Sequence, residues 1–388
     1  MFNPFEIDLS LLSQRAYNLR WATVPQGVIP LTAADPDLPI AQPIKEALLD
    51  YVKGGYLSYG PAEGLLSFRQ AVSTDYKLKN QVDYAPEYIL PVDSAAFGIY
   101  LICSALLQPG DEVIVFDPVD FLFKYSVEQV GAKALAFKTP QSEDFVDFSY
   151  LNALITSKTK LICLCNPLNP TGKVFTKTEL EALAEIVAAH KELMVLSDEI
   201  WSDIVFAPNK FHSFSGISRM FDRTITVTGY SKSYGLAGLR IGSILMPNQS
   251  LYEKIFAHSL HQSTVHGANV LGQIAAEAAL NHAQDWLMGF VSHLHKMRDF
   301  SVQRLNAMPG VSCEAPQGCY VLFPDISNTG FTASELQSHL IEGAKVAVVP
   351  GLPKWFGAGA QGHIRLSFAT SYDLLDQAFD RMDKFFRS

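Results

Sequence analysis

The sequence predicts an α/β protein built on a mostly parallel sheet with helices on both faces. Between about residues 85 and 250, short apolar runs alternate with longer segments of helical period, as expected for repeated strand–helix–strand units. After about residue 280 the sequence pattern changes to one long helical segment, followed by a mixture of strand-like and helical segments. The first forty residues are irregular and rich in proline. These observations predict an N-terminal segment (1–40) that joins a small C-terminal α+β domain (281–388), with a large domain (41–280) between them.

Seven apolar runs in the large domain read as strands and predict a seven-stranded sheet. They span residues 88–92, 112–116, 133–137, 160–165, 193–197, 224–228 and 241–246. Helical patterns lie between them, for example over residues 95–107 and 175–190. In the second of these, Thr176 and Glu179 have the spacing of a capping box, which marks a helix start. The long pattern of the small domain covers about residues 284–305.

The composition narrows the class of protein. The chain has 388 residues, of which 48% are apolar and 18% charged, which is ordinary for a soluble globular protein. Its formal net charge is −9 and no block of like charges occurs, so we expect neither nucleic acid nor a membrane surface as a partner. The N-terminus lacks the pattern of a signal peptide, and no apolar stretch is long enough to span a bilayer.

The cysteines favour a reducing compartment. There are five of them, an odd number, and no pair has the spacing of a zinc or redox site. Buried, reduced thiols are the simplest interpretation, and we expect no metal. A cytoplasmic location follows as an expectation.

The segment SKSYGLAGLR, residues 231–240, is the most informative one. It places Lys232 just after a predicted strand, among small residues that let backbone approach a ligand closely. Arg240 can donate two hydrogen bonds to a phosphate. A nearby cation lowers the pKa of a lysine amine, and Schiff-base chemistry requires a neutral amine. A stray lysine in a glycine-rich turn is the alternative.

This segment resembles the attachment signature of the class I/II aminotransferases, which are fold-type I enzymes of pyridoxal 5′-phosphate (PLP). The similarity recurs in order from about residue 34 to 369. It implies the fold-type I PLP transferase architecture, with PLP bound to Lys232 as a Schiff base. In SDEIWSD (197–203), Asp198 matches the aspartate that pairs with the pyridine nitrogen and keeps it protonated. In CNPLNPTG (165–172), Asn169 matches the asparagine that contacts the phenolic oxygen and lies beside the substrate.

The resemblance also assigns the phosphate and substrate contacts. In VDSAAFG (92–98), a predicted helix N-terminus suits an anion, so Ser94, Ala95 and Ala96 are phosphate candidates, together with Arg240 and Ser231.

For the substrate, Arg365 in IRLSFA (364–369) matches the arginine that grips the α-carboxylate, and Ala34 in AADPD (33–37) lies in the loop that offers backbone to it. Tyr59 in YGPAEG (59–64) matches a tyrosine that reaches the phosphate of the neighbouring subunit. The resemblance therefore implies a homodimer with shared sites.

Three positions depart from the family pattern. Trp201 replaces the usual tyrosine three residues after the ring-binding aspartate, and an indole N–H can donate a hydrogen bond but cannot accept one. Gly229 replaces a Ser or Thr three residues before the lysine. Asp120 stands where an aromatic ring usually stacks on the cofactor, two residues after Pro118, so Phe121 is our choice for the stacking ring.

The resemblance implies an aminotransferase that moves an amino group between an L-amino acid and a 2-oxo acid. The alternative is a PLP-dependent C–S β-lyase, because residues 197–205 also resemble the cystathionine β-lyase-like branch of the superfamily. Other PLP reactions on a modified amino acid stay open as well. A non-catalytic effector-binding domain is a further possibility, although only about forty residues precede the fold and they carry no basic helix-turn-helix pattern.

Overall fold

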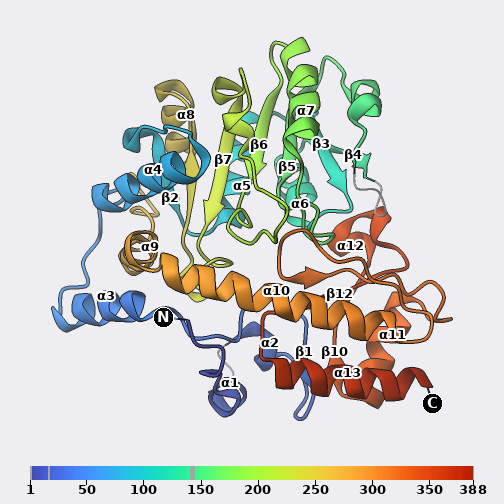
Figure 1. Cartoon of the computed structure of the whole chain (residues 1–388). Coiled ribbons are helices and arrows are strands. Elements are labelled where there is room, and N and C mark those ends of the chain that lie inside the picture. The colour runs from blue at the N-terminus through green and yellow to red at the C-terminus, as the bar shows by residue number, and fades with distance from the viewer. Residues whose placement is uncertain (1, 16–17, 140–144, 388) are drawn as a thin grey trace.

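A seven-stranded sheet forms the centre of the protein (Figure 1). The structure is a computed structural model that describes residues 2–15, 18–139 and 145–387. The strands follow the order β2-β8-β7-β6-β5-β3-β4, and β8 alone in this sheet runs antiparallel to its neighbours. They are β2 (Ile89–Val92), β3 (Glu112–Asp117), β4 (Lys133–Lys138), β5 (Thr159–Cys165), β6 (Met194–Asp198), β7 (Thr224–Gly229) and β8 (Gly242–Leu245). The predicted mostly parallel, seven-stranded α/β sheet is confirmed.

Burial on both faces explains why these runs carry so little polar alternation. β7 and β8 are buried along their whole length, and β5 and β6 along nearly all of theirs. Helix α5 packs on one face, against β2, β6, β7 and β8, so the strands must be apolar on both sides. The predicted capping box also forms, because the Thr176 hydroxyl accepts a hydrogen bond from the Glu179 amide at the start of α7.

The helices surround this sheet and extend below it. They are α1 (Leu9–Arg15), α2 (Leu19–Ala22), α3 (Gln42–Lys53), α4 (Leu66–Asn80), α5 (Ala95–Leu106), α6 (Leu122–Gln129), α7 (Lys177–Ala189), α8 (Gln249–Ser259), α9 (Val270–His282), α10 (Gln284–Asn306), α11 (Ala333–His339), α12 (Pro353–Phe356) and α13 (Tyr372–Arg387). In Figure 1, α10 crosses beneath the sheet and α13 lies below α10. No helix in the described ranges is long and apolar enough to cross a membrane.

Both ends of the chain contribute to the layer beneath the sheet. Strand β1 (Ile29–Pro30) pairs in parallel with β10 (Val346–Ala347), and β9 (Val321–Leu322), β11 (Val349–Pro350) and β12 (Ile364–Ser367) form an antiparallel sheet in the order β11-β12-β9. The N-terminal segment thus joins the C-terminal part, as expected. The domain boundaries near residues 40 and 280 stay predictions.

The carboxyl ends of the parallel strands face this lower layer (Figure 1). Polar segments follow β2, β3, β5, β6 and β7 at that edge, which is where open α/β sheets bind ligands. The fold therefore brings the predicted site segments to one place, between the large sheet and β12.

Candidate active site

A cavity of about 260 Å³ lies at the carboxyl edge of the sheet. Every predicted site residue except Phe121 and Tyr59 contributes to its lining. These residues are Ala34, Ser94, Ala95, Ala96, Asn169, Asp198, Trp201, Ser231, Lys232, Arg240 and Arg365. They come from six separate segments of the chain, so the cavity exists only in the folded protein.

Lys232 lies in this cavity with an amine suited to nucleophilic chemistry. Its Nζ donates a hydrogen bond to the Ala34 carbonyl oxygen at 2.6 Å and lies 5.3 Å from the centre of the Trp201 ring. Among the described residues, no carboxylate lies within ion-pair distance of it. Burial lowers the pKa of Lys232, and the charge of Arg365 lowers it further, against an opposing effect from Asp35. A lower pKa raises the fraction of neutral, nucleophilic amine.

Asp198 is the last residue of β6 and is a buried acid that forms no ion pair with any residue in the described ranges. Its Oδ1 accepts a hydrogen bond from the Ile200 amide at 3.1 Å. Burial raises the pKa of Asp198 to about 7, and the nearby Asp120 raises it too, while Lys232 lowers it. A positively charged N–H placed against this carboxylate would relieve that desolvation.

Arg365 on β12 presents a guanidinium that has room for a carboxylate. Its two Nη atoms donate to Asn169 Oδ1 and to the Thr32 carbonyl oxygen, each at 3.3 Å, while its buried Nε has no hydrogen-bond partner in the part of the chain that the structure describes. The side chain is 8% exposed and stands over the Phe356 ring at 5.1 Å. A buried guanidinium with contacts this long is ready to receive a planar anion.

The opposite end of the cavity is suited to a phosphate. Ser94 caps α5, and the backbone amides of Ala95 and Ala96 open that helix. A Cβ on Gly242 would lie 2.5 Å from the Ala95 amide nitrogen, so only glycine lets β8 approach this turn. Arg240 is exposed, and its guanidinium donates one hydrogen bond among the described residues, a 3.3 Å contact to the Ala237 carbonyl oxygen, so most of its donors remain open to an anion.

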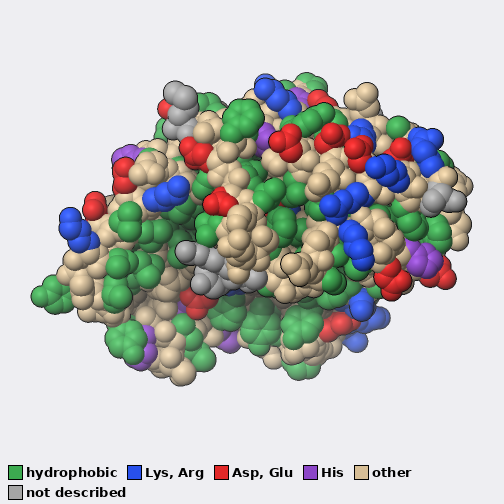
Figure 2. Space-filling model, turned by 90° about the horizontal axis from the view of Figure 1, so that it is seen from below, with side chains coloured by type: hydrophobic (Ala, Val, Ile, Leu, Met, Phe, Trp, Pro, Cys, Tyr) green, Lys and Arg blue, Asp and Glu red, His purple; other side chains and the backbone are tan. Residues whose placement is uncertain are grey.

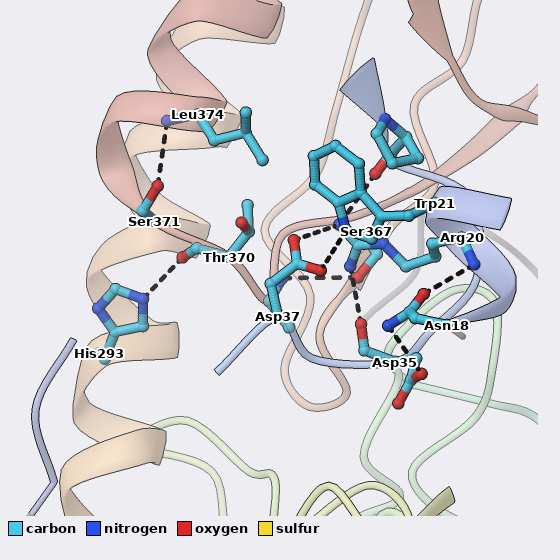
Figure 3. Close-up of polar contacts among 12 residues, drawn as sticks. Asn18, Arg20, Trp21, Asp35, Asp37, His293, Ser367, Thr370, Ser371 and Leu374 are labelled. Atoms are coloured by element: carbon cyan, nitrogen blue, oxygen red, sulfur yellow. Dashed lines mark hydrogen bonds and ion pairs between the residues drawn. The ribbon is translucent and has the colours of Figure 1, made fainter. Parts of the chain in front are cut away.

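The loop over residues 33–37, which borders the cavity, is held by a buried ion pair that sequence reasoning missed (Figure 3). Arg20 on α2 donates to Asp37 Oδ2 at 2.8 Å, to the Asp35 carbonyl oxygen at 2.8 Å and to the Pro30 carbonyl oxygen at 2.9 Å. Trp21 Nε1 donates to the other Asp37 oxygen at 2.9 Å. The side chains of Arg20 and Asp37 are fully buried.

Removal of one partner should destabilise the protein strongly. We expect Arg20→Met to lower the free energy of unfolding by about 3–5 kcal/mol, because the buried carboxylate of Asp37 loses its cation. Urea denaturation monitored by far-UV circular dichroism measures this change. Lys77→Met breaks the exposed pair with Asp83 and should change stability by less than about 1 kcal/mol. Equal effects of the two substitutions would contradict this view of Arg20.

The prediction for Phe121 needs correction. Phe121 does not line the cavity: it is the residue before α6, and its side chain faces a neighbouring cavity, edge-on to Trp355 with ring centres 5.4 Å apart. The chain enters α6 at Leu122, so Leu122 and Phe123 reach the site instead. Asp120, at the position that the family usually gives to an aromatic ring, also lines the cavity.

Tyr59 and Trp201 lie in different surroundings. Tyr59 is 85% exposed and its ring is 5.1 Å from that of His266, outside the cavity of its own chain. Its role in a neighbouring subunit stays a prediction. Trp201 lines the cavity and packs edge-on against Tyr320, with ring centres 4.6 Å apart.

Comparison with known proteins decides the family. The family model for aminotransferase class I and II matches residues 26–382. The chain belongs to this family. An aspartate aminotransferase of Pyrococcus abyssi is 33% identical, with 93% of this chain and 92% of the relative aligned. A bifunctional aspartate aminotransferase and glutamate/aspartate-prephenate aminotransferase of Petunia hybrida is 34% identical, with 96% and 79% aligned.

Solved structures agree with this assignment. The aromatic aminotransferase from Pyrococcus horikoshii OT3 has a TM-score of 0.87 at 30% identity over 94% of this chain and 96% of that one. A PLP-bound putative aminotransferase from Clostridium difficile 630 has a TM-score of 0.91 at 25% identity over the whole of both chains. Cystalysin from Treponema denticola, at 22% identity, shares the fold. The protein is a PLP-dependent aminotransferase.

Proposed function

We propose that Lys232 is the residue that binds PLP and moves the substrate proton in this aminotransferase. The observation that carries the proposal is that one cavity gathers Lys232, Asp198 and Arg365. When bound, PLP supplies an aldehyde that condenses with amines and a conjugated ring that withdraws electrons from the substrate α-carbon. The amine of Lys232, with its lowered pKa, then accepts the α-proton and returns it at a neighbouring carbon.

The remaining lining residues fit PLP from three sides. Asp198, which forms no ion pair with a described residue, suits the pyridine nitrogen. Asn169 donates one of its two Nδ2 hydrogens to Asp120, and its second Nδ2 hydrogen suits the phenolic oxygen. The Ser94 hydroxyl and the amides of Ala95 and Ala96 suit the phosphate. Ser231, Arg240 and Trp201 complete the cofactor contacts. We propose that the Phe121 ring does not stack on the cofactor.

Arg365 and Ala34 orient the substrate. The open face of Arg365 receives the α-carboxylate in a bidentate contact, and Asn169, which already bonds Arg365, holds the guanidinium in place. The Ala34 carbonyl oxygen accepts a hydrogen bond from Lys232 Nζ, so the loop that offers backbone to the α-carboxylate lies next to the amine. A fixed carboxylate and amine leave one orientation for the Cα–H bond.

A half-reaction with a single amino acid tests the proposal. Holoenzyme mixed with one L-amino acid and no 2-oxo acid should change its visible spectrum to that of pyridoxamine phosphate, with release of one 2-oxo acid per site. Pyruvate and sulfide released from cysteine derivatives over many turnovers, without that spectral change, would instead identify a C–S β-lyase.

We further propose a homodimer whose sites include Tyr59 of the neighbouring subunit. Large apolar side chains are exposed on and after α3, with exposed fractions from 51% to 85%: Leu49, Val52, Tyr56, Leu57 and Tyr59. Figure 2 shows hydrophobic side chains protruding at the left edge, the side on which α3 lies in Figure 1. Such a patch is typical of a surface that another chain covers.

Mixing two inactive variants tests the shared site. Lys232→Ala lacks the amine, and Tyr59→Ala lacks the phosphate contact in trans. Subunit exchange between them produces hybrid dimers in which one site has both residues, so activity should return on mixing. Sedimentation velocity establishes the dimer independently. Two variants that exchange subunits but regain no activity would contradict the role of Tyr59.

We also propose a cytoplasmic location. All five cysteines are buried and unpaired in the structure, which suits a compartment that keeps thiols reduced. Titration of the denatured protein with a thiol reagent, immediately after isolation from its native source, should count five free thiols.

A further inference from the structure

Asp120 is the charged residue of the cavity to which the proposed function gives no role. Among the described lining residues, Lys232 and Asp198 act on the cofactor, Arg240 on the phosphate and Arg365 on the α-carboxylate. The one ionisable carboxyl or basic group that remains is Asp120. It stands at the sequence position where the family usually has an aromatic ring, so its charge is a property of this chain.

Local contacts hold the Asp120 carboxylate in place. Its Oδ2 accepts a hydrogen bond from Asn169 Nδ2 at 2.9 Å, and its Oδ1 accepts one from the Leu122 amide at 3.3 Å. Its own amide donates to the Asn169 carbonyl oxygen at 3.1 Å. An ionised carboxylate has about four acceptor sites, so two remain for a ligand. The group is therefore fixed in position but not saturated.

The negative charge of Asp120 is balanced by two cationic residues that the substrate and the cofactor engage. Burial raises the pKa of Asp120, and Arg365 and then Lys232 lower it by their charges. A substrate α-carboxylate on Arg365 takes up the first of these cations, and the cofactor engages the second. The half-buried carboxylate of Asp120 then has less positive charge near it and keeps two open acceptor sites, so a cation on the substrate side chain would stabilise it.

We propose that Asp120 is a specificity-determining residue that selects 2-amino acids with a cationic side chain and disfavours dicarboxylic ones. A side-chain cation restores the balance that Arg365 provided, whereas a second carboxylate on the substrate would repel the carboxylate of Asp120. This inference rests on the proposed function, because it takes Arg365 as the site of the α-carboxylate. It sets this chain apart from relatives whose names specify aspartate or glutamate.

Three ligands that lack an α-amino group isolate the effect of charge. 4-Guanidinobutanoate, 4-ureidobutanoate and adipate share one carboxylate and have a planar terminal group at the same distance, which is positive, neutral or negative. None of them has an amine that could react with the cofactor. Isothermal titration calorimetry of the holoenzyme should show 4-guanidinobutanoate binding at least about tenfold more tightly than 4-ureidobutanoate, with adipate the weakest.

Asp120→Asn should remove most of this discrimination. It keeps the size of the side chain, so the two isosteric ligands should come within about threefold of each other and adipate should bind more tightly. Asp120→Glu keeps the charge and should retain the original order. Asp83→Asn is the matched control. It neutralises an exposed aspartate that pairs with Lys77 of α4, and it should leave the affinities for all three ligands unchanged. The kcat/KM ratio of L-arginine to L-citrulline should change in parallel.

The outcomes separate the two proposals. Tightest binding of adipate to the wild type, or an unchanged guanidino-to-ureido ratio in Asp120→Asn, overturns the inference and leaves the proposed function standing. If the charge order holds but no amino acid converts the cofactor spectrum, the proposed function fails and charge selection by Asp120 stands. If none of the three ligands binds and no amino acid reacts, both fail.

Discussion

Lys232→Ala should abolish the covalent attachment of PLP and reduce the rate of amino transfer by at least about 10²–10⁴-fold, the range that a positioned general base contributes. In the wild type, borohydride reduction of the holoenzyme should add one PLP to each chain, located at Lys232 by mass spectrometry. The cavity supplies no substitute amine, since Arg240 and Arg365 are the other basic residues among its described lining groups and guanidinium groups stay protonated.

A lysine that lies outside the cavity provides the control for this experiment. Lys124 on α6 lines the neighbouring cavity and is exposed, so Lys124→Ala should keep both the covalent cofactor and the activity. Full turnover by Lys232→Ala, or a borohydride-reducible link at another lysine, would refute the assignment of the site.

Asp198→Asn should lower kcat by about 10²–10³-fold, which is typical when one preorganised electrostatic contact is removed. Asparagine keeps the shape of the side chain but cannot hold a protonated pyridine nitrogen by charge. The affinity for PLP should fall as well, and equilibrium dialysis measures it. A variant with wild-type kcat would show that the cofactor nitrogen meets some other group.

Asp198 should also make the stability of the cofactor-free protein depend on pH. Burial raises the pKa of Asp198 from its usual 3.8 to about 7, so the folded protein binds this proton more tightly than the unfolded chain. The free energy of unfolding of the cofactor-free protein should therefore fall as pH rises from about 4 to 7, by about 4 kcal/mol from this residue.

Denaturant titrations of cofactor-free protein at several pH values test this expectation. Asp198→Asn removes the titrating group, so its stability should depend less steeply on pH. Glu199, whose pKa burial also raises to about 7, has the same sign and should account for part of the slope that remains. Identical slopes in the wild type and in Asp198→Asn would contradict a raised pKa at Asp198.

Periodicity and strand ends sufficed to predict most of the fold and the centre of the site. The strands of the large sheet are apolar on both sides, so their runs stand out in the sequence, and residues such as Asp198 follow directly at their carboxyl ends. Local patterns say less about loops. The short turn from β3 into α6 decides whether Asp120, Phe121 or Phe123 faces the cavity, and no repeat within so few residues shows which.

Contacts between residues far apart in the chain could not be predicted from the sequence for a different reason. Arg20 and Asp37 look like surface charges, because nothing near either residue shows that α2 packs over the loop at residues 33–37. The two-residue strands β1 and β10 are too short for any alternation to appear. Such contacts arise from tertiary packing, which single-sequence patterns do not encode.

The pairing of β1 with β10 also fixes when the cavity can be completed during synthesis. Ile29 pairs with Val346, so the two partners lie 317 positions apart in the sequence (346 − 29). A ribosome that adds about 5–20 residues each second needs many seconds to span that gap, and the large sheet has all its strands long before then. During synthesis the carboxyl edge of the large sheet is therefore not yet covered by the C-terminal part of the chain. Ala34 contacts Lys232 only when the last strands have emerged.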